Sequence, residues 1–308
     1  MIQVQPGGIA ALDVGGTAMK GALLNPDLTI AAAYRWPTPR EEGPDAVVAA
    51  VLTAVDELLE ASGGTQAVGL VVPGLVDDRA GVARYSENIG WRDVSFRSIL
   101  EDRSGLPVGF GHDVRAGGLA ERTLGAGSGA YDTFFMPIGT GISGAMYVQG
   151  RSLDNMFAGE IGHIDVGTGE LCVCGSIGCL ETIATGPSIA RRYNALTGSS
   201  ISGAKPVVDR LAAGDAAAAA VWQDAVDALA SALAIYVTLL SPELVVIGGG
   251  LSLAGETLLG PVRDALARKL SWQPMPGIVA AALGDNAACL GAGILALAAS
   301  GASVGALA

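Results

Sequence analysis

The stretch GIAALDVGGTAMKGALL, residues 8–24, consists of two apolar runs separated by Asp-Val-Gly-Gly-Thr. This pattern predicts two strands joined by a tight turn. Glycine allows backbone N–H groups to approach an anion closely, and the Thr17 hydroxyl adds a donor. We therefore expect the turn at residues 13–17 to bind phosphate, with a plain hairpin turn as the alternative.

The same arrangement returns in the second half of the chain. A predicted strand, 133–138, is followed by Gly-Thr-Gly and then by a second strand, 142–148. This turn also matches G-x-G-x-x-G, but a dinucleotide site requires a helix directly after the glycines, and here the strand continues. One phosphate turn in each half of the chain predicts ATP bound in a cleft between two duplicated domains.

Strand and helix patterns alternate along the rest of the chain, which predicts an α/β fold. Prolines and glycines mark several of the boundaries. The predicted elements are strands at 20–25, 28–36, 67–72 and 244–247, another strand ending near 110, and helices at 44–62, 115–124, 216–240 and 257–269.

Two further features point to a bound nucleotide. Asp13 ends a predicted buried strand, where its carboxylate is suited to hold Mg²⁺ through water or to cap the turn. The glycines at 248–250 follow another predicted strand and are expected beside the adenosine, unless they form only a strand–helix turn. The expected nucleotide-binding residues are Asp13, Gly15, Gly16, Thr17, Lys20, Gly139, Thr140, Gly141, Gly248, Gly249 and Gly250.

Composition limits the class of protein. Half of the 308 residues are apolar and only 16% are charged, which is ample material for two buried cores. The net charge is −12 and the basic residues are scattered, so we expect no nucleic-acid partner. The N-terminus lacks the pattern of a secretory signal. The uncharged segment 286–308 is mostly Ala, Gly and Ser, which favours a packed helix over a membrane span, and we expect a cytoplasmic protein.

Three of the four cysteines lie within eight positions. Together with His163, the residues Cys172, Cys174 and Cys179 offer one imidazole and three thiolates, which match a closed tetrahedral zinc site. Because four protein ligands leave no open position, the zinc is expected to be structural. The alternative is a group of free buried cysteines near an unrelated histidine, and the isolated Cys289 is expected to be a core residue.

With these motifs together, the chain resembles the ROK family (repressors, open reading frames and kinases), particularly its bacterial glucokinases. The resemblance covers most of the chain, and the zinc segment is its most specific part. The matching stretches are LDVGGTAMKGAL (12–23), GLVVPGLVD (69–77), SENIGW (86–91), GHDVRAGGLAE (111–121), PIGTGISGAMYVQG (137–150), AGEIGHIDVGTGELCVCGSIGCLETIAT (158–185) and LVVIGGGLS (244–252).

The resemblance implies roles for individual residues. Asp113 would be the general base that takes the proton of the sugar 6-hydroxyl as this oxygen attacks the γ-phosphate of ATP. An N-terminal cap of a helix is the alternative for this residue. His163 would contact the sugar with one ring nitrogen while the other binds zinc. The implied sugar-binding residues are Gly74, Asn88, His112, Asp113, Glu160, His163 and Glu181, of which the two glutamates are alternatively surface carboxylates and Asn88 a turn residue.

One position departs from the family pattern. Family members usually carry Asn directly before the catalytic Asp, where it contacts hydroxyls around C3 and C4 of the sugar, and here the residue is His112. An imidazole presents its donor and acceptor differently from an amide. The change is either tolerated with glucose as substrate, or it favours an amino sugar such as kanosamine or an N-acetyl hexosamine, or a cyclitol.

The resemblance implies an actin-like ATPase fold of the acetate/sugar kinase–hsp70–actin type. We expect a small N-terminal domain at 1–125, with a terminal helix (287–308) packing back onto it, and a large domain at 126–286. The match begins near Ala10, so we expect no winged-helix DNA-binding domain, and a kinase rather than a repressor.

The expected reaction is hexose 6-phosphorylation by ATP and Mg²⁺, in a homo-oligomer (dimer or tetramer) that does not associate with membranes. Polyphosphate is an alternative phosphoryl donor. A non-catalytic sugar sensor, an actin-like filament protein and an oxidoreductase are the other classes considered.

Overall fold

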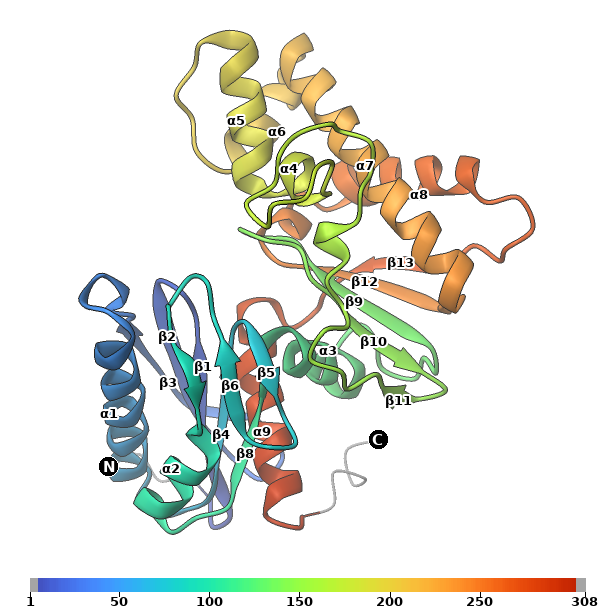
Figure 1. The fold of residues 1–308 in the computed structure, drawn as a ribbon. Coiled ribbons are helices and arrows are strands. Elements are labelled where there is room, and N and C mark those ends of the chain that lie inside the picture. Colours follow the sequence, from blue (N-terminus) through green and yellow to red (C-terminus); the bar gives the residue numbers. More distant parts are fainter. Residues whose placement is uncertain (1–4, 303–308) are drawn as a thin grey trace. The chain divides into compact units, whose positions relative to one another are not determined.

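The computed structural model describes residues 5–302. Part of the predicted terminal helix, 303–308, therefore lies outside the described residues. Contacts divide the chain into two compact units (Figure 1). Unit 1 comprises 1–124, 154–158 and 285–308, and unit 2 comprises 125–153 and 159–284.

Unit 1 is built on a five-stranded sheet with the order β3-β2-β1-β4-β8. The central strand β1 is antiparallel to β2 and parallel to β4, and β4 is parallel to β8. Every residue of β1 is buried, as its uninterrupted apolar sequence predicts for a strand covered on both faces. The strands are β1 (Gly8–Val14), β2 (Ala18–Leu24), β3 (Ile30–Pro37), β4 (Thr65–Val72) and β8 (Val108–His112).

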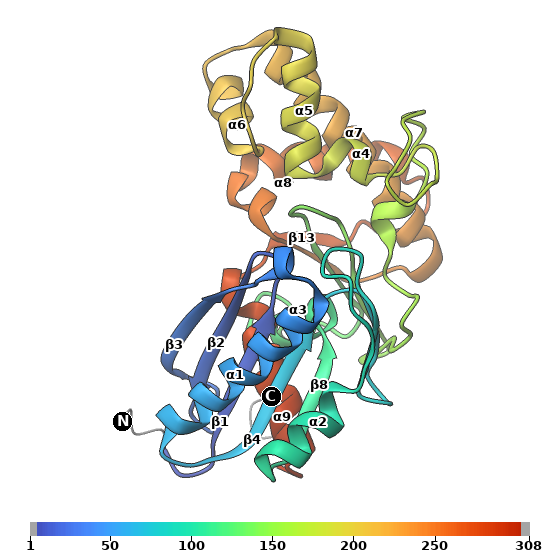
Figure 2. The same ribbon diagram turned by 60° about the vertical axis from the view of Figure 1, so that its left-hand side comes forward.

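Helices cover both faces of this sheet (Figure 2). Helix α1 (Pro44–Ser62) begins with a proline and ends at Gly63 in the left-handed conformation, as its sequence predicts. Its apolar face packs with Val68 and Leu70 of β4 in one core. The alternate residue Gly69 faces helix α9 (Ala287–Ala299), which also contacts β1, β8 and helix α3 (Asp113–Leu124). Alternate residues of β4 therefore face opposite sides of the sheet, with α1 on one side and α9 on the other.

A smaller antiparallel sheet and one helix lie in sequence between β4 and β8. They are β5 (Leu75–Asp77), β6 (Val82–Tyr85), β7 (Arg92–Val94) and α2 (Phe96–Ser104). The rings of Trp91 and Phe96 meet edge to face with centroids 5.3 Å apart, and both side chains are fully buried. This aromatic pair joins the smaller sheet and α2 to the main core of unit 1.

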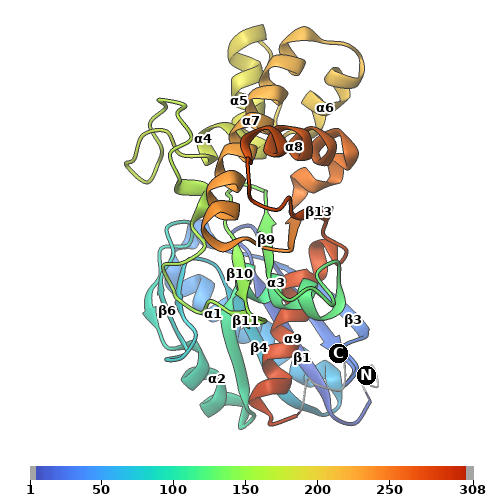
Figure 3. The same cartoon turned by 90° about the vertical axis from the view of Figure 1, so that its right-hand side faces the viewer.

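Unit 2 repeats the central strand arrangement of unit 1. Its sheet has the order β11-β10-β9-β12-β13, with β9 antiparallel to β10 and parallel to β12 (Figure 3). The repetition confirms the predicted α/β class and the strand–turn–strand unit in each half. The strands are β9 (Thr133–Pro137), β10 (Ala145–Val148), β11 (Arg151–Ser152), β12 (Leu244–Gly248) and β13 (Gly277–Ala280).

The helices of unit 2 pack around α7 (Ala216–Leu240), whose bounds equal those predicted. Asp215 caps this helix by accepting the N–H groups of Ala217 and Ala218. Of the described helices, only α7 is long and apolar enough to cross a bilayer, and half of its most apolar window is buried in the unit. The other helices of unit 2 are α4 (Glu181–Ala184), α5 (Gly186–Thr197), α6 (Lys205–Ala212) and α8 (Glu256–Lys269). Its 3₁₀ turns are η2 (Ile161–His163) and η3 (Gly250–Ala254), whereas η1 (Arg40–Glu42) belongs to unit 1 and η4 (Gly284–Asn286) spans the boundary between the units in sequence.

The close packing of α9 on the sheet yields a stability prediction. A Cβ added to Gly109 of β8 would overlap the backbone of Leu295 and Ala296 in α9, so Gly109→Ala should lower the melting temperature strongly. Gly260 of α8 is the matched control, because an added Cβ there meets only Glu256 Oε2, at 3.7 Å. Gly260→Ala should raise the unfolding free energy by up to about 1 kcal/mol. Equal effects in calorimetry would contradict the close contact at Gly109.

Candidate functional site

The first phosphate turn follows β1 in unit 1. Asp13 is the penultimate residue of the strand and pairs in register with Lys20 across the β1–β2 hairpin. Burial raises the pKa of Asp13 to about 6, against the opposing effect of Lys20. Gly15 donates its N–H to Ala18 and accepts the Thr38 hydroxyl, which fixes the turn, while Thr17 at its tip is exposed.

One residue beside this turn was not anticipated from the sequence. Asp285 of η4 has its carboxylate 3.5 Å from Lys20 Nζ, and its charge contributes to the raised pKa of Asp13. It lies 265 positions from Lys20, in a segment without a recognisable motif. No local pattern pointed to it, because its position depends on how α9 packs against the sheet.

His112 and Asp113 stand where β8 ends and α3 begins. The Asp113 side chain is 26% exposed, and its Oδ1 accepts the Val114 N–H at 2.7 Å. The predicted helix start at 115 is therefore two residues late, because Asp113 already belongs to the first turn.

The imidazole of His112 faces protein groups with both of its ring nitrogens. Nδ1 accepts the Arg115 N–H at 3.4 Å, and Nε2 lies 3.4 Å from Asp113 Oδ1. Accepting at Nδ1 assigns the proton to Nε2, which then points toward the Asp113 carboxylate. Burial, aided by the charge of Arg115, lowers the pKa of His112 to about 3 and keeps the ring neutral.

The two other sugar-binding candidates of unit 1 lie in exposed loops. Gly74 follows β4 with φ +101°, and an added Cβ would lie 2.9 Å from the Ser86 Cα. Asn88 is exposed, and its Cβ would lie 4.0 Å from a Cβ built on Gly16. The structure thus brings Asn88 beside the first phosphate turn, a proximity that the sequence did not predict.

In unit 2 the remaining two glycine turns are adjacent. Ile138 donates its N–H to Gly248 and accepts the N–H of Leu251, which joins the second phosphate turn to residues 248–251. The predicted second strand begins at Ala145 rather than at 142, because Ile142 makes only an isolated bridge to Ile138. Residues 139–144 therefore form a longer loop, with Thr140 and Gly141 exposed.

The predicted metal ligands converge in unit 2. The ligand atoms of His163, Cys172, Cys174 and Cys179 all lie within 4.8 Å of one another. Cys174 Sγ is 3.7 Å from Cys179 Sγ, and Cys172 Sγ is 3.8 Å from His163 Nδ1. Sulfurs around a tetrahedral zinc are about 3.8 Å apart, given Zn–S bonds of about 2.3 Å. The donor set and its spacing therefore fit zinc, with Nδ1 as the histidine ligand.

The other predicted unit 2 residues flank this cluster. Glu160 is exposed and precedes η2, which carries His163. Glu181 begins α4, two residues after Cys179, and its Oε1 accepts the Ile142 N–H at 2.5 Å. A cavity of about 660 Å³ has Thr140, Glu181 and the segment 170–173 among its lining.

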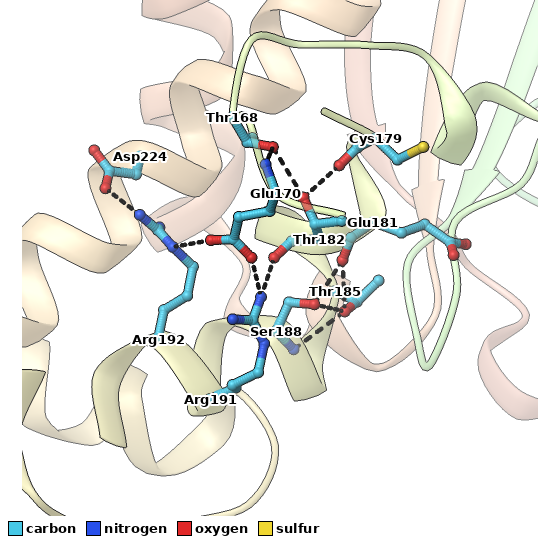
Figure 4. A network of polar contacts seen from close by, with 10 residues as sticks. All are labelled: Thr168, Glu170, Cys179, Glu181, Thr182, Thr185, Ser188, Arg191, Arg192 and Asp224. Carbon is cyan, nitrogen blue, oxygen red and sulfur yellow. Dashed lines mark hydrogen bonds and ion pairs between the residues drawn. The ribbon is translucent and has the colours of Figure 1, made fainter. Parts of the chain in front are cut away.

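A polar network anchors the cluster to the helices (Figure 4). Glu170 pairs with Arg191 and Arg192 of α5, and Arg192 reaches Asp224 of α7. The Thr182 hydroxyl bonds to the Cys179 carbonyl at 2.7 Å and lies 3.1 Å from the Thr168 hydroxyl. The ligand-bearing loop is thus tied to α4, α5 and α7 by polar contacts.

The buried His112 predicts a pH-dependent difference in stability. In the unfolded chain a histidine takes up a proton near pH 6.5, whereas folded His112 stays neutral down to about pH 3. The contribution of His112 to the free energy of unfolding is therefore fully present above pH 6.5 and is lost progressively as the pH falls toward 3.

Calorimetry of wild type and His112→Asn from pH 7 to pH 4 tests this expectation. Between pH 7 and pH 5, the free energy of unfolding of the variant should rise by about 2 kcal/mol relative to that of wild type. Titration of groups that do not contact residue 112 is common to both proteins and cancels in the difference. A difference that does not change with pH would contradict the buried neutral imidazole.

The cysteine cluster predicts one tightly bound zinc per chain. Cys179→Ser should lower the zinc content and the melting temperature, because one thiolate is lost and the loop residues are poorly buried. Cys289→Ser is the matched control, since Cys289 is buried in α9, far along the chain from the cluster. Plasma emission spectroscopy of purified samples gives the zinc content. Equal zinc in both variants would refute the assignment.

Comparison with known proteins agrees with this geometry. The chain matches the ROK family over residues 9–299. It is 34% identical to a glucokinase of Halalkalibacterium halodurans, over 82% of this chain and 83% of that protein. It is 33% identical to an N-acetylmannosamine kinase of Citrobacter koseri, over 93% of this chain and 97% of that protein.

Two solved structures show the same fold. A ROK hexokinase from Thermus thermophilus is 32% identical with a TM-score of 0.82, covering 94% of this chain and 98% of that one. A ROK glucokinase from Streptomyces griseus, solved with glucose and AMPPNP, is 29% identical with a TM-score of 0.81, covering 94% and 99%. These likenesses confirm the expected actin-like fold, and the chain belongs to the ROK family.

Proposed function

We propose that this protein is an ATP-dependent kinase that phosphorylates the 6-hydroxyl of glucose or a glucose-like hexose. Membership of the ROK family and likeness to glucokinases support a sugar kinase. The observation that carries the proposal is the Asp113 carboxylate, which is partly exposed at the end of β8 and held by the Val114 N–H. A carboxylate in such a position is suited to accept a proton from a bound hydroxyl.

In the proposed reaction Asp113 removes the proton of the sugar 6-hydroxyl. The resulting oxygen attacks the γ-phosphorus of ATP, its new P–O bond forms, and the bond to the β-phosphate oxygen breaks to release ADP. The two glycine turns would hold the phosphates with backbone N–H groups, and Gly248–Gly250 would lie against the adenosine. Asp13 would hold Mg²⁺ through water, and Mg²⁺ would offset charge on the transferred group.

The sugar-binding set proposed for unit 2 is Glu160, His163 and Glu181, and for unit 1 it is Gly74, Asn88, His112 and Asp113. His163 Nδ1 points to Cys172, so Nε2 is the nitrogen that would face a sugar hydroxyl. Zinc would supply a fixed ring orientation and no step of the reaction. We also expect a cytoplasmic homo-oligomer, and polyphosphate is a second donor to be tested.

His112 favours a second candidate substrate, an amino sugar or another hexose changed at C3 or C4. Its side chain is 10% exposed, and its ring nitrogens face Arg115 N–H and the Asp113 carboxylate. Because both ring nitrogens face protein groups, this imidazole would discriminate less strictly than the family's Asn between sugars that differ at the C3 and C4 hydroxyls. Likeness to an N-acetylmannosamine kinase supports testing amino sugars, but that sugar carries its nitrogen at C2 and does not bear on C3 or C4.

A coupled ADP-release assay across glucose, mannose, N-acetyl hexosamines, kanosamine and allose tests both candidates. Glucose as by far the best substrate would remove the second candidate. A broad profile or a preference for kanosamine would support it, and polyphosphate can replace ATP in a parallel series.

Asp113→Asn tests the catalytic role. Loss of a general base should lower kcat by about 10²–10⁴-fold while sugar affinity changes little. Asp102→Asn, on the exposed surface of α2 in the same unit, is the matched control and should keep wild-type kcat. If wild type binds sugars but phosphorylates none, the protein is a sugar sensor and the proposal fails.

A further inference from the structure

We propose that Glu181 is a positioning residue for the second phosphate turn, holding the Ile142 amide with one carboxylate oxygen while the other contacts the sugar. The inference rests on the proposed kinase function and adds a role on the nucleotide side to a residue otherwise expected to contact only the sugar. The turn in question is Gly139–Gly144.

Glu181 contacts the second phosphate turn directly. Glu181 Oε1 accepts the Ile142 N–H at 2.5 Å, 39 positions apart in sequence. Hydrogen bonds to an ionised acceptor are shorter and stronger than neutral ones. Within residues 5–302, Oε2 has no hydrogen-bonding partner, so it remains available to a ligand hydroxyl.

The Glu181 carboxylate lies close against the backbone of two glycines. A Cβ built on Gly141 would lie 2.7 Å from Glu181 Oε1, and one built on Gly162 would lie 2.9 Å from it. Any side chain at either position would displace the carboxylate or its neighbours. Gly141 belongs to the phosphate turn and Gly162 to η2, so the glutamate fits between the turn and the segment that carries His163.

Among the described residues, few other hydrogen bonds support the turn. Gly139 donates to Gly141 within the turn, and Gly186 at the start of α5 donates its N–H to the Gly139 carbonyl at 3.2 Å. Glu181 and Gly186 therefore hold the two sides of the turn from one short stretch that directly follows Cys179. The backbone of Glu181 is itself fixed, because its carbonyl accepts the hydroxyls of Thr185 and Ser188.

A consequence for binding follows from the two oxygens. A carboxylate that contacts a sugar hydroxyl with Oε2 is ordered by that contact, and the ordered Oε1 then holds the Ile142 amide in place. Binding of the sugar should therefore strengthen binding of the nucleotide, and by reciprocity the nucleotide should strengthen binding of the sugar.

Two substitutions separate the functions of the two oxygens. In Glu181→Gln the amide oxygen can still accept the Ile142 N–H, but the NH₂ group can no longer accept a sugar hydroxyl. This variant should keep nucleotide affinity within about twofold and lose sugar affinity. Glu181→Ala removes both contacts and should weaken Mg²⁺–AMPPNP binding, without sugar, by about tenfold, as expected for a lost charge-assisted hydrogen bond.

Isothermal titration calorimetry with AMPPNP alone and with glucose alone measures these affinities. Hydrogen–deuterium exchange of peptides covering Ile142 gives a readout independent of any ligand, and exchange should be faster in Glu181→Ala only. Glu170→Ala is the matched control. It removes the other network carboxylate of the segment, which bonds to Arg191 and Arg192 rather than to the turn.

The outcomes separate this inference from the proposed function. AMPPNP binding that is unchanged in both Glu181 variants overturns the inference, as does an equal loss in Glu170→Ala, which would indicate general loosening of the segment. If Glu181→Ala does not fold, Glu181→Gln decides, because loss of AMPPNP affinity in that variant overturns the inference. Wild type that binds AMPPNP but phosphorylates no sugar refutes the kinase proposal and leaves the nucleotide result standing.

Discussion

The loop from His163 to Cys179 depends on the convergence of four side chains. It contains little apolar material that could fold it, since Leu171, Val173 and Ile177 are all exposed and Cys172 and Cys179 are among its few buried side chains. A loop of this kind loses much conformational entropy on folding and gains little from burial. Zinc bound by the four ligand atoms, which lie within 4.8 Å of one another, would supply the missing constraint. The positions of His163 and of the start of α4 would both depend on this constraint.

The two sheets provide a rigid base for turns that must remain open. In each unit a central strand is antiparallel to one neighbour and parallel to the other, and the glycine turn extends from the hairpin side. The central strand β1 is buried throughout and β9 is buried except at Pro137, whereas Thr17, Thr140 and Gly141 at the tips are exposed. Backbone donors are thereby offered to solvent from positions that the sheet holds fixed.

Much of this arrangement could be predicted from local sequence. The bounds of α7, the strand β1 and the metal ligands follow from periodicity and residue type over short distances. The start of α3 and the length of the loop before Ala145 were misjudged, because tertiary contacts decide both of them. Nothing local indicated that Asp285 lies near Lys20, or that Glu181 bonds to Ile142, since each pair joins distant segments with no shared pattern.

The packing of α9 also has a consequence for how the protein folds during synthesis. This helix contacts β1, β4, β8 and α3, and close glycine contacts fit it to the sheet. Residues 287–299 must therefore leave the ribosome before the layer over β1, made some 280 residues earlier, is complete. Until then one apolar face of the first sheet stays uncovered, so unit 2, whose residues are all made by then, can complete its core first.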